Sequence, residues 1–395
     1  MAGRAASHAA AAKSAAILFI AVRILLTGWA VVALRVNPLP EEPDEGVRPY
    51  LGEPALREGA AGFLLGPWQR FDTQHYMRIA RDGYASEQDS VFPPLYPLAV
   101  RGLSALFGGD AAGRLLAGLL LSNLAGLGLL ILLHQMASAV LGPGAAARTV
   151  LYIALFPTGF FLFAPYSEPI FILLAAGPFW AARKGRFWLA GGLGLLAALT
   201  RLTGVVLVVP LLFEYWRQAR ETGQSIRAWL LSGAASLLPV AGTAAFLLWR
   251  RWAGLPPLQT VYEQHWFQTT GLPGSDLITA VHSLFFGGAA RTGEFTLAFD
   301  FACALFLIVS TVLVFRRFGV AFGLYNLTML LFMFLPVSEL KPLYSFSRYT
   351  LAFFPTFMLL GAAGGRPWVH RLILYPSLAL FLYFSGQFFA WGWVA

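Results

Sequence analysis

The sequence predicts an all-α polytopic membrane protein that crosses the bilayer about eleven times. Hydrophobic residues make up 58% of the 395 and charged residues only 12%, and the mean hydropathy is +0.66, which soluble globular proteins do not show. Apolar runs of the length that a bilayer requires recur along the chain. The cations behind the net charge of +9 form short clusters between these runs, as in cytoplasmic membrane loops, so no nucleic-acid partner is expected.

The first predicted span covers residues 15–36 and follows a short basic stretch. It resembles a secretory signal. We nevertheless predict that it is retained, because it is long for a signal core, contains Arg23 and is followed by no clear cleavage site. The later predicted spans are, in order, 112–140, 149–166, 168–182, 187–200, 202–214, 229–249, 299–315, 318–337, 348–363 and 371–393.

Charge places the loops on two sides of the membrane. If the N-terminus is cytoplasmic, the basic clusters between spans all fall on the inner side. The outer side then carries two long loops, 37–111 and 250–298, and a short one, 338–347. The first loop is acidic at its start, in residues 41–45. We therefore expect a single transmembrane domain over 1–395 with two long extracytoplasmic loops.

Two apolar blocks, 149–182 and 187–216, are too long for one crossing, yet each half is short for a span. A half of ~15 helical residues rises only ~22 Å against a hydrocarbon thickness of ~30 Å. Each block has one charge near its middle, Glu168 in the first and Arg201 in the second. Interrupted helices with charges at that depth line protein or a wet cavity. We expect these two side chains to face the same cavity as the first loop and to pair with each other.

The first outer loop carries the strongest chemical signal. Residues 70–76 read Arg-Phe-Asp-Thr-Gln-His-Tyr, and the spacing from 73 to 81 predicts a helix. A carboxylate, Asp72, beside arginine, histidine and tyrosine at the mouth of a bilayer is a candidate for acid/base chemistry. The structural alternative is that Asp72 is the N-cap of that helix or a solvated loop acid.

These residues resemble the signature of the PIG-V-like mannosyltransferases, membrane glycosyltransferases of the GT-C fold. The matching pieces occur in the family's order and are short, and they comprise 71–84, 92–97, 155–158, 166–168, 201–204, 347–349 and 354–355. Three positions depart from the pattern. Phe71 stands where the family usually has tryptophan, Pro94 interrupts the Phe-Pro-aromatic run, and Leu202 replaces a common proline.

The resemblance implies inverting transfer of mannose, or a related hexose, from a polyprenyl-phosphate sugar to a hydroxyl of a lipid-linked or membrane-associated acceptor on the extracytoplasmic face. Asp72 is the candidate base. Arginine and lysine can pair with the departing phosphate, so neither a metal nor a cofactor is expected. The candidate substrate-binding residues are Arg70, His75, Tyr76, Tyr96, Glu168, Arg201, Lys341, Arg348 and Tyr349.

Several alternatives stay open from the sequence. Instead of binding substrate, Arg348 and Lys341 could be interface residues that snorkel at span ends. Glu168 could be the polar cap of a hairpin turn. The aromatic segment 262–267 of the second loop suits either a lid over the site or a belt at the lipid headgroups. The rival functions are a lipid-linked sugar flippase or transporter and a non-catalytic membrane subunit. The abundance of Ala, Gly, Leu and Arg favours a bacterial source, for which the plasma membrane is the expected location.

Overall fold

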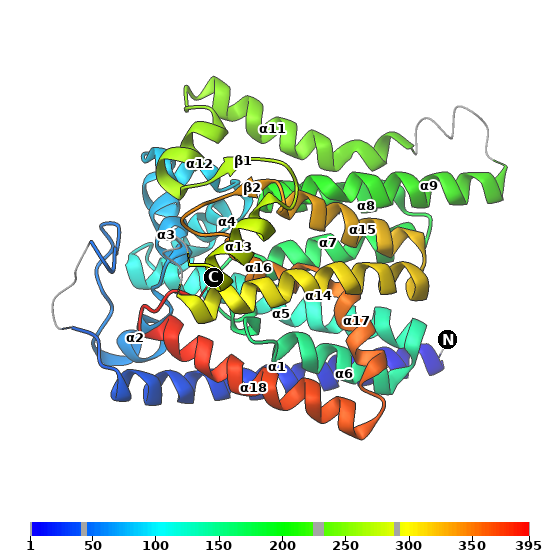
Figure 1. Ribbon diagram of the computed structural model, residues 1–395, viewed down its shortest axis with the longest axis horizontal. Coiled ribbons are helices and arrows are strands. Elements are labelled where there is room, and N and C mark those ends of the chain that lie inside the picture. Colours follow the sequence, from blue (N-terminus) through cyan, green and yellow to red (C-terminus); the bar gives the residue numbers. More distant parts are fainter. Residues whose placement is uncertain (1, 41–45, 224–232, 288–292, 395) are drawn as a thin grey trace. The chain divides into compact units, whose positions relative to one another are not determined.

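The structure is a computed structural model that describes residues 2–40, 46–223, 233–287 and 293–394. It is helical apart from one short antiparallel pair of strands, β1 (Thr269–Thr270) and β2 (Pro336–Val337), with Thr269 opposite Val337 (Figure 1). The predicted helical class is confirmed. The acidic start of the first loop at 41–45 and part of the second loop at 288–292 lie outside the described residues.

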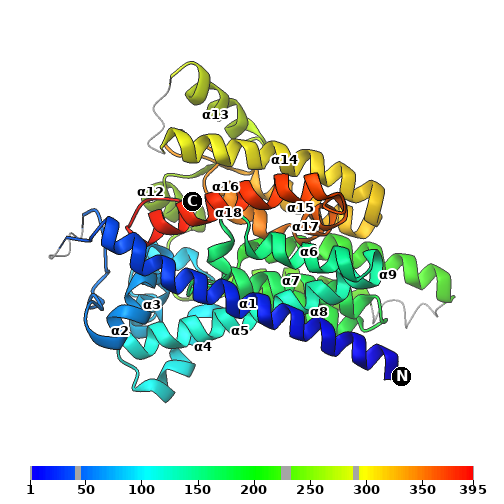
Figure 2. The same cartoon turned by 90° about the horizontal axis from the view of Figure 1, so that it is seen from below.

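Four of the described helices are long and apolar enough to cross a membrane, which makes the chain an integral membrane protein (Figures 1 and 2). They are α1 (Ala2–Val36), α5 (Ala111–Leu141), α14 (Glu294–Phe318) and α18 (Pro367–Phe389). Shorter apolar helices accompany them, namely α7 (Glu168–Ala182), α8 (Phe187–Thr200), α15 (Val320–Met333), α17 (Phe354–Ala363) and the segment Leu95–Phe107. The total of about eleven spans stays a prediction.

The two interrupted hairpins expected from the sequence are present. The first joins α6 (Pro143–Ala154) to α7, and the second joins α8 to the 3₁₀ turn η5 (Leu202–Leu207) and α9 (Val208–Thr222). Glu168 is the first residue of α7 and Arg201 is the C-cap of α8, so both charges lie at the apices. The expectation of one span over 149–166 was wrong, because the helix ends at Ala154 before Pro157, a residue that cannot continue it.

The segment that follows α6, residues 155–167, is buried and non-helical except for the 3₁₀ turn η4 (Gly159–Leu162). Its carbonyl oxygens need donors because the surroundings are apolar. A guanidinium nitrogen of Arg23 in α1 donates to the Phe163 carbonyl at 3.0 Å, and Ser122 Oγ in α5 donates to the Tyr166 carbonyl at 2.7 Å. Arg23 therefore has a structural reason to lie within the first span.

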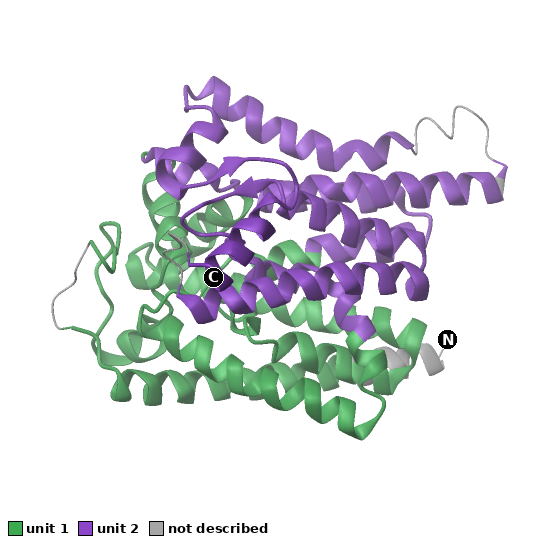
Figure 3. Ribbon diagram, in the orientation of Figure 1, with its two compact units in different colours: residues 1–85, 95–173, 360–394 green, residues 86–94, 174–359, 395 purple. Residues whose placement is uncertain are grey.

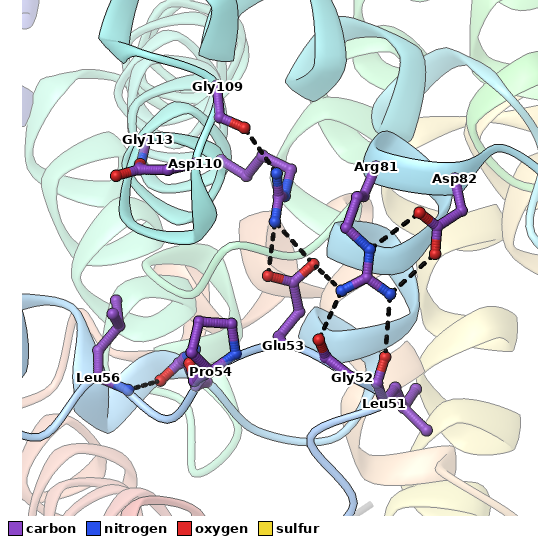
Figure 4. Close-up of polar contacts among 12 residues, drawn as sticks. Leu51, Gly52, Glu53, Pro54, Leu56, Arg81, Asp82, Gly109, Asp110 and Gly113 are labelled. Atoms are coloured by element: carbon purple, nitrogen blue, oxygen red, sulfur yellow. Dashed lines mark hydrogen bonds and ion pairs between the residues drawn. The ribbon is translucent and has the colours of Figure 1, made fainter.

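The described part of segment 37–111, the predicted first outer loop, is folded. Its elements are α2 (Gly59–Leu64), η1 (Gly66–Trp68), α3 (Asp72–Asp82), η2 (Glu87–Val91), α4 (Leu95–Ser104) and η3 (Ala105–Phe107). A buried carboxylate, Glu53, joins two helices, since it lies 2.7 Å from a guanidinium nitrogen of Arg114 in α5 and 3.0 Å from one of Arg81 in α3. Figure 4 shows Glu53 beside Arg81. These ion pairs hold the end of α3 against α5.

Segment 250–298, the predicted second outer loop, contains α12 (Leu258–Trp266) and α13 (Ser275–Phe285), and it follows α11 (Leu238–Trp252). Trp266 packs edge-on against Phe92 with the ring centroids 5.6 Å apart, and its indole N–H donates to the Gln88 carbonyl at 3.3 Å. Part of the aromatic segment therefore packs on the η2 segment of the chain. The choice between lid and headgroup belt stays open.

Two compact units are distinguished in Figure 3. The first contains 1–85, 95–173 and 360–394, and the second contains 86–94, 174–359 and 395. The second unit also includes α16 (Phe346–Tyr349) and η7 (Thr350–Ala352). The division passes through α7 and α17. A single domain over the whole chain, as expected from the sequence, stays a prediction.

Candidate functional site

Asp72 is the first residue of α3 in the first unit, and it is only 9% exposed. The helix predicted for 73–81 is confirmed, but the N-cap position belongs to Phe71, so Asp72 is not the N-cap that the structural alternative proposed. By contrast Asp110 is a true N-cap, whose side chain accepts from the Gly113 N–H at 2.7 Å.

The backbone immediately before this carboxylate is strained. Phe71 has φ 49° and ψ −122°, a conformation that glycine tolerates and a bulky residue does not. Such strain persists only where surrounding contacts enforce it, and it concentrates at functional sites. The Phe71 ring meets those of Phe388, Trp391 and Trp393 at centroid distances of 5.8, 5.3 and 5.5 Å. This aromatic cluster holds the turn that presents Asp72.

The strain at Phe71 makes a stability prediction. Phe71→Gly and Phe71→Ala both remove the ring, but only glycine relieves the backbone, so the glycine variant should be more stable by about 1–3 kcal/mol. Unfolding of the purified protein in detergent measures this difference. At Phe388, which lies within α18, the same pair of substitutions should show the usual order, with glycine the less stable by about 0.5–1 kcal/mol. The same order at both positions would contradict strain at Phe71.

Tyr166 connects the start of α3 to the irregular segment 155–167 by hydrogen bonds. Its hydroxyl accepts from the Asp72 backbone N–H at 3.2 Å and donates to the Arg70 carbonyl at 3.3 Å. Next to it, the hydroxyls of Ser167 and Tyr76 are 2.8 Å apart. The sequence identified Tyr166 only as part of a motif, because a contact between residues 94 positions apart leaves no local pattern. In the structure its hydroxyl fixes the backbone on both sides of Phe71.

Tyr166→Phe is expected to lower kcat about tenfold, the equivalent of about 1.4 kcal/mol, because the Asp72 N–H loses a buried acceptor and the turn relaxes. KM for the donor should stay the same. The matched control is Tyr325→Phe, which removes another buried hydroxyl that donates to a carbonyl, that of Ala352 at 2.8 Å. If both variants lower only the melting temperature, Tyr166 has no specific role in positioning Asp72.

Arg70, expected to contact substrate, is fully buried and bonded to main-chain carbonyls. It donates to the carbonyls of Phe389 at 2.9 Å and of Gly66 and Gln69 at 3.0 Å each, and its guanidinium lies 5.2 Å from the Trp391 ring centroid. Burial lowers its pKa to about 10, which still leaves it charged at neutral pH. These contacts favour a positioning role for Arg70, since they join the turn before Asp72 to the C-terminal segment.

The remaining candidates of the first unit gather around α3. Tyr76 and Tyr96 meet edge to face at 4.7 Å, and the Tyr96 hydroxyl bonds the Gly118 carbonyl at 3.1 Å and Ser122 Oγ at 2.9 Å. Tyr96 is completely buried, which favours a structural role. His75 in α3 and Glu168 at the start of α7 are also buried. Substrate contact by these two residues, and pairing of Glu168 with Arg201, stay predictions.

The second unit brings three of the predicted substrate-binding residues together. The guanidinium carbons of Arg201 and Arg348 lie 5.0 and 5.2 Å from the centroid of the same ring, that of Tyr349. Lys341 lies 5.0 Å from the ring centroid of Tyr344. Arg201 and Arg348 thus lie at one aromatic ring, and the planar guanidinium of an arginine can bind a phosphate bidentately.

A sequence model of the family described as Mannosyltransferase (PIG-V) matches residues 17–222, slightly more than half of the chain. The chain is 34% identical over 162 residues to GPI alpha-1,6-mannosyltransferase 2 of Rattus norvegicus, covering 39% of this chain and 33% of the relative. For the protein of the same name from Homo sapiens the identity is 33% over 158 residues, covering 37% and 31%. The matches thus span about a third of these relatives' length.

Solved structures are similar to the chain at lower identity. ArnT from Cupriavidus metallidurans bound to undecaprenyl phosphate has a TM-score of 0.47 and 17% identity, covering 95% of this chain and 76% of ArnT. The oligosaccharyltransferase of Archaeoglobus fulgidus, in complex with Zn and sulfate, has a TM-score of 0.43 and 12% identity, covering 92% and 53%.

Proposed function

The chain belongs to the PIG-V mannosyltransferase family, and from this premise we propose that it transfers mannose, or a related hexose, from a polyprenyl-phosphate sugar to a hydroxyl of a lipid-linked or membrane-associated acceptor. The observation that carries the proposal is the buried carboxylate of Asp72, presented by the strained Phe71 at the start of α3. Strain beside a buried acid is typical of a catalytic position. The family match includes Asp72, Glu168 and Arg201, whereas Lys341 and Arg348 lie beyond it.

The proposed reaction is a single inverting displacement. Asp72 accepts the proton of the acceptor hydroxyl as that oxygen forms a bond to the anomeric carbon. The bond from that carbon to the phosphate oxygen breaks on the opposite side, and the polyprenyl phosphate leaves with the bonding electrons. Each product then carries its full complement of atoms, and the proton ends on Asp72 before it is lost to water.

Cations of the second unit have the complementary task. The departing phosphate gains negative charge, and positive groups fixed in advance stabilise that charge as it develops. Arg348 and Arg201, held at the ring of Tyr349, suit this task, with Lys341 as a third cation. In this proposal Asp72 accepts the proton of the acceptor hydroxyl, and Arg348, Arg201 and Lys341 stabilise the departing phosphate.

The proposed setting is the extracytoplasmic face of a bacterial plasma membrane. The spans provide a lipid-facing groove for the prenyl tail, and burial of the tail contributes affinity at ~0.8 kcal/mol per methylene. The polar residues are then left to set geometry and charge. Labelling of a single cysteine introduced into the first outer loop, by a reagent that does not cross the membrane, tests this orientation.

Transfer by the purified protein in liposomes is the direct test of the function. Supplied with polyprenyl-phosphate mannose and a membrane extract as acceptor, the protein should release polyprenyl phosphate and move labelled mannose to a lipid-soluble product. Polyprenyl-phosphate glucose is the matched donor for sugar preference. Movement of intact donor across the bilayer without release of polyprenyl phosphate would identify a flippase instead, and no activity without another protein would indicate a non-catalytic subunit.

Shortening the prenyl chain of the donor should raise KM more than it lowers kcat. The tail contributes binding in both ground and transition states, and removal of such uniform binding leaves turnover unchanged. A series of synthetic donors that differ by one isoprene unit at a time measures the two constants. A KM that does not vary with chain length would exclude the groove.

A further inference from the structure

Two buried acids of the second unit bond the backbone of the segment that carries Lys341 and Arg348, residues 338–348, which we name the tethered segment. Asp276 in α13 accepts from the Ser338 N–H at 3.0 Å and from the Leu343 N–H at 2.7 Å. Asp300 in α14 accepts from the Ser347 N–H at 2.7 Å. The acids are 3% and 2% exposed. These three hydrogen bonds fix three backbone positions of the segment.

The tethered segment needs this support because its own conformation is unfavourable. Leu343 and Ser345 have φ of 54° and 62°, in the region that non-glycine residues avoid. The two residues lie between Lys341 and Arg348, so relaxation of either turn would change the direction of both cations. Strain of this kind persists only where neighbouring contacts enforce it.

The segment is joined to α13 at its start as well. β1 pairs with β2 immediately before Ser338, and the Gly271 N–H donates to the Leu335 carbonyl at 3.0 Å. Within the segment, the Lys341 N–H donates to Ser338 Oγ at 3.1 Å. Asp276 thus lies at the centre of a continuous set of contacts between residues 269–276 and 335–343.

We propose that Asp276 is a positioning residue for donor binding, which holds the tethered segment in the conformation that presents Lys341 and Arg348 to the phosphate of the polyprenyl-phosphate sugar. The inference rests on the proposed function, because that function supplies the phosphate. Its physical basis is preorganisation, since cations already fixed in place lose less freedom when the anion binds. Asp300 supports the far end of the segment.

The alternative is that Asp276 only stabilises the fold. Its burial shows at least that its contacts with the tethered segment are not incidental. Burial raises the pKa of Asp276 to about 6, while the two N–H donors from Ser338 and Leu343 act in the opposite direction. An acid that is costly to bury and faces two donors from one segment is built to hold that segment. Asp300 is a less clean probe than Asp276 because Arg348 interacts with it electrostatically.

The test compares Asp276→Ala and Asp276→Asn with the wild type, and Glu339→Gln is the matched control. Glu339 is exposed and lies in the same segment, so its substitution removes one negative charge near Lys341 without removing a tether. Two measurements are made on protein in nanodiscs. One is hydrogen exchange of peptides covering 336–345, and the other is the affinity for polyprenyl phosphate, which requires no sugar transfer.

We expect Asp276→Ala to accelerate exchange of the Ser338 and Leu343 amides and to weaken polyprenyl phosphate binding, each about tenfold, with kcat affected less than KM. Asp276→Asn keeps one acceptor and should lie between alanine and wild type. Faster exchange with unchanged affinity would overturn the positioning role, and unchanged exchange would overturn the tether itself. Equal effects from Glu339→Gln would make charge the cause and overturn it too. A wild type that binds no polyprenyl phosphate would refute the proposed donor. The exchange measurement would still show whether Asp276 restrains the Ser338 and Leu343 amides.

Discussion

Asp72→Asn is expected to lower kcat by about 10²–10⁴-fold, the contribution that a positioned general base makes. The amide has nearly the shape of the carboxylate but cannot take a proton from the acceptor hydroxyl. KM for the donor and the melting temperature should change little, because the N-cap of α3 is Phe71 and the Asp72 backbone N–H still reaches Tyr166. Initial rates of labelled sugar transfer, together with thermal unfolding in detergent, measure both parts of this expectation.

Asp110→Asn is the matched control for that experiment. Asp110 also stands at the start of a helix, and its side chain caps the Gly113 N–H of α5. Asparagine is as good an N-cap as aspartate, so this variant should retain both stability and turnover. If Asp72→Asn turned over at the normal rate, the base would have to be another residue, and the strain at Phe71 would need a different explanation.

Local patterns in the sequence predicted much of the fold correctly. The spacing after Asp72 predicted α3, and the short halves of the two apolar blocks predicted hairpins with Glu168 and Arg201 at their apices. Both signals depend on helix periodicity and on the length that a bilayer requires. These properties can be read from residues that are close together in the sequence.

The contacts that set the site geometry could not be predicted in the same way. Tyr166 reaches Asp72 across 94 positions, and Asp276 reaches Ser338 across 62. No periodicity links such residues, and a single tyrosine or aspartate is common in any loop. The positive φ of Phe71 was equally hidden, because phenylalanine normally indicates extended or helical backbone. The aromatic residues that enforce it come from the other end of the chain.

Arg70 shows which properties of a buried cation the sequence does not reveal. An arginine two positions before the proposed base is a reasonable candidate for a substrate ligand. The sequence does not show which protein groups that arginine contacts. The structure supplies three carbonyls and an aromatic face. A guanidinium with these contacts stabilises the turn before Asp72.

Glu53→Gln is expected to destabilise the protein by about 3–5 kcal/mol, the largest stability effect among the substitutions considered. Glu53 is 5% exposed and accepts from Arg114, itself 8% exposed, through both carboxylate oxygens at 2.9 and 2.7 Å (Figure 4). Neutralising the acid leaves a buried arginine charge without compensation. Because the pair joins the loop before α2 to α5, and Arg81 extends it to α3, the end of α3 should loosen as well. Unfolding in detergent and proteolysis near residue 82 report these two effects.

The exposed pair of Glu221 with Arg217, at 2.8 Å, gives the comparison that isolates burial. Its loss in Glu221→Gln should cost no more than about 0.5 kcal/mol, because solvent screens exposed charges. A second comparison is the double variant Glu53→Gln with Arg114→Met, which removes both buried charges and should recover a large part of the lost stability. If the double variant were as unstable as Glu53→Gln alone, the stabilisation would come from packing of the Glu53 side chain. Recovery would instead show that the cost of Glu53→Gln comes from the Arg114 charge left buried without its partner.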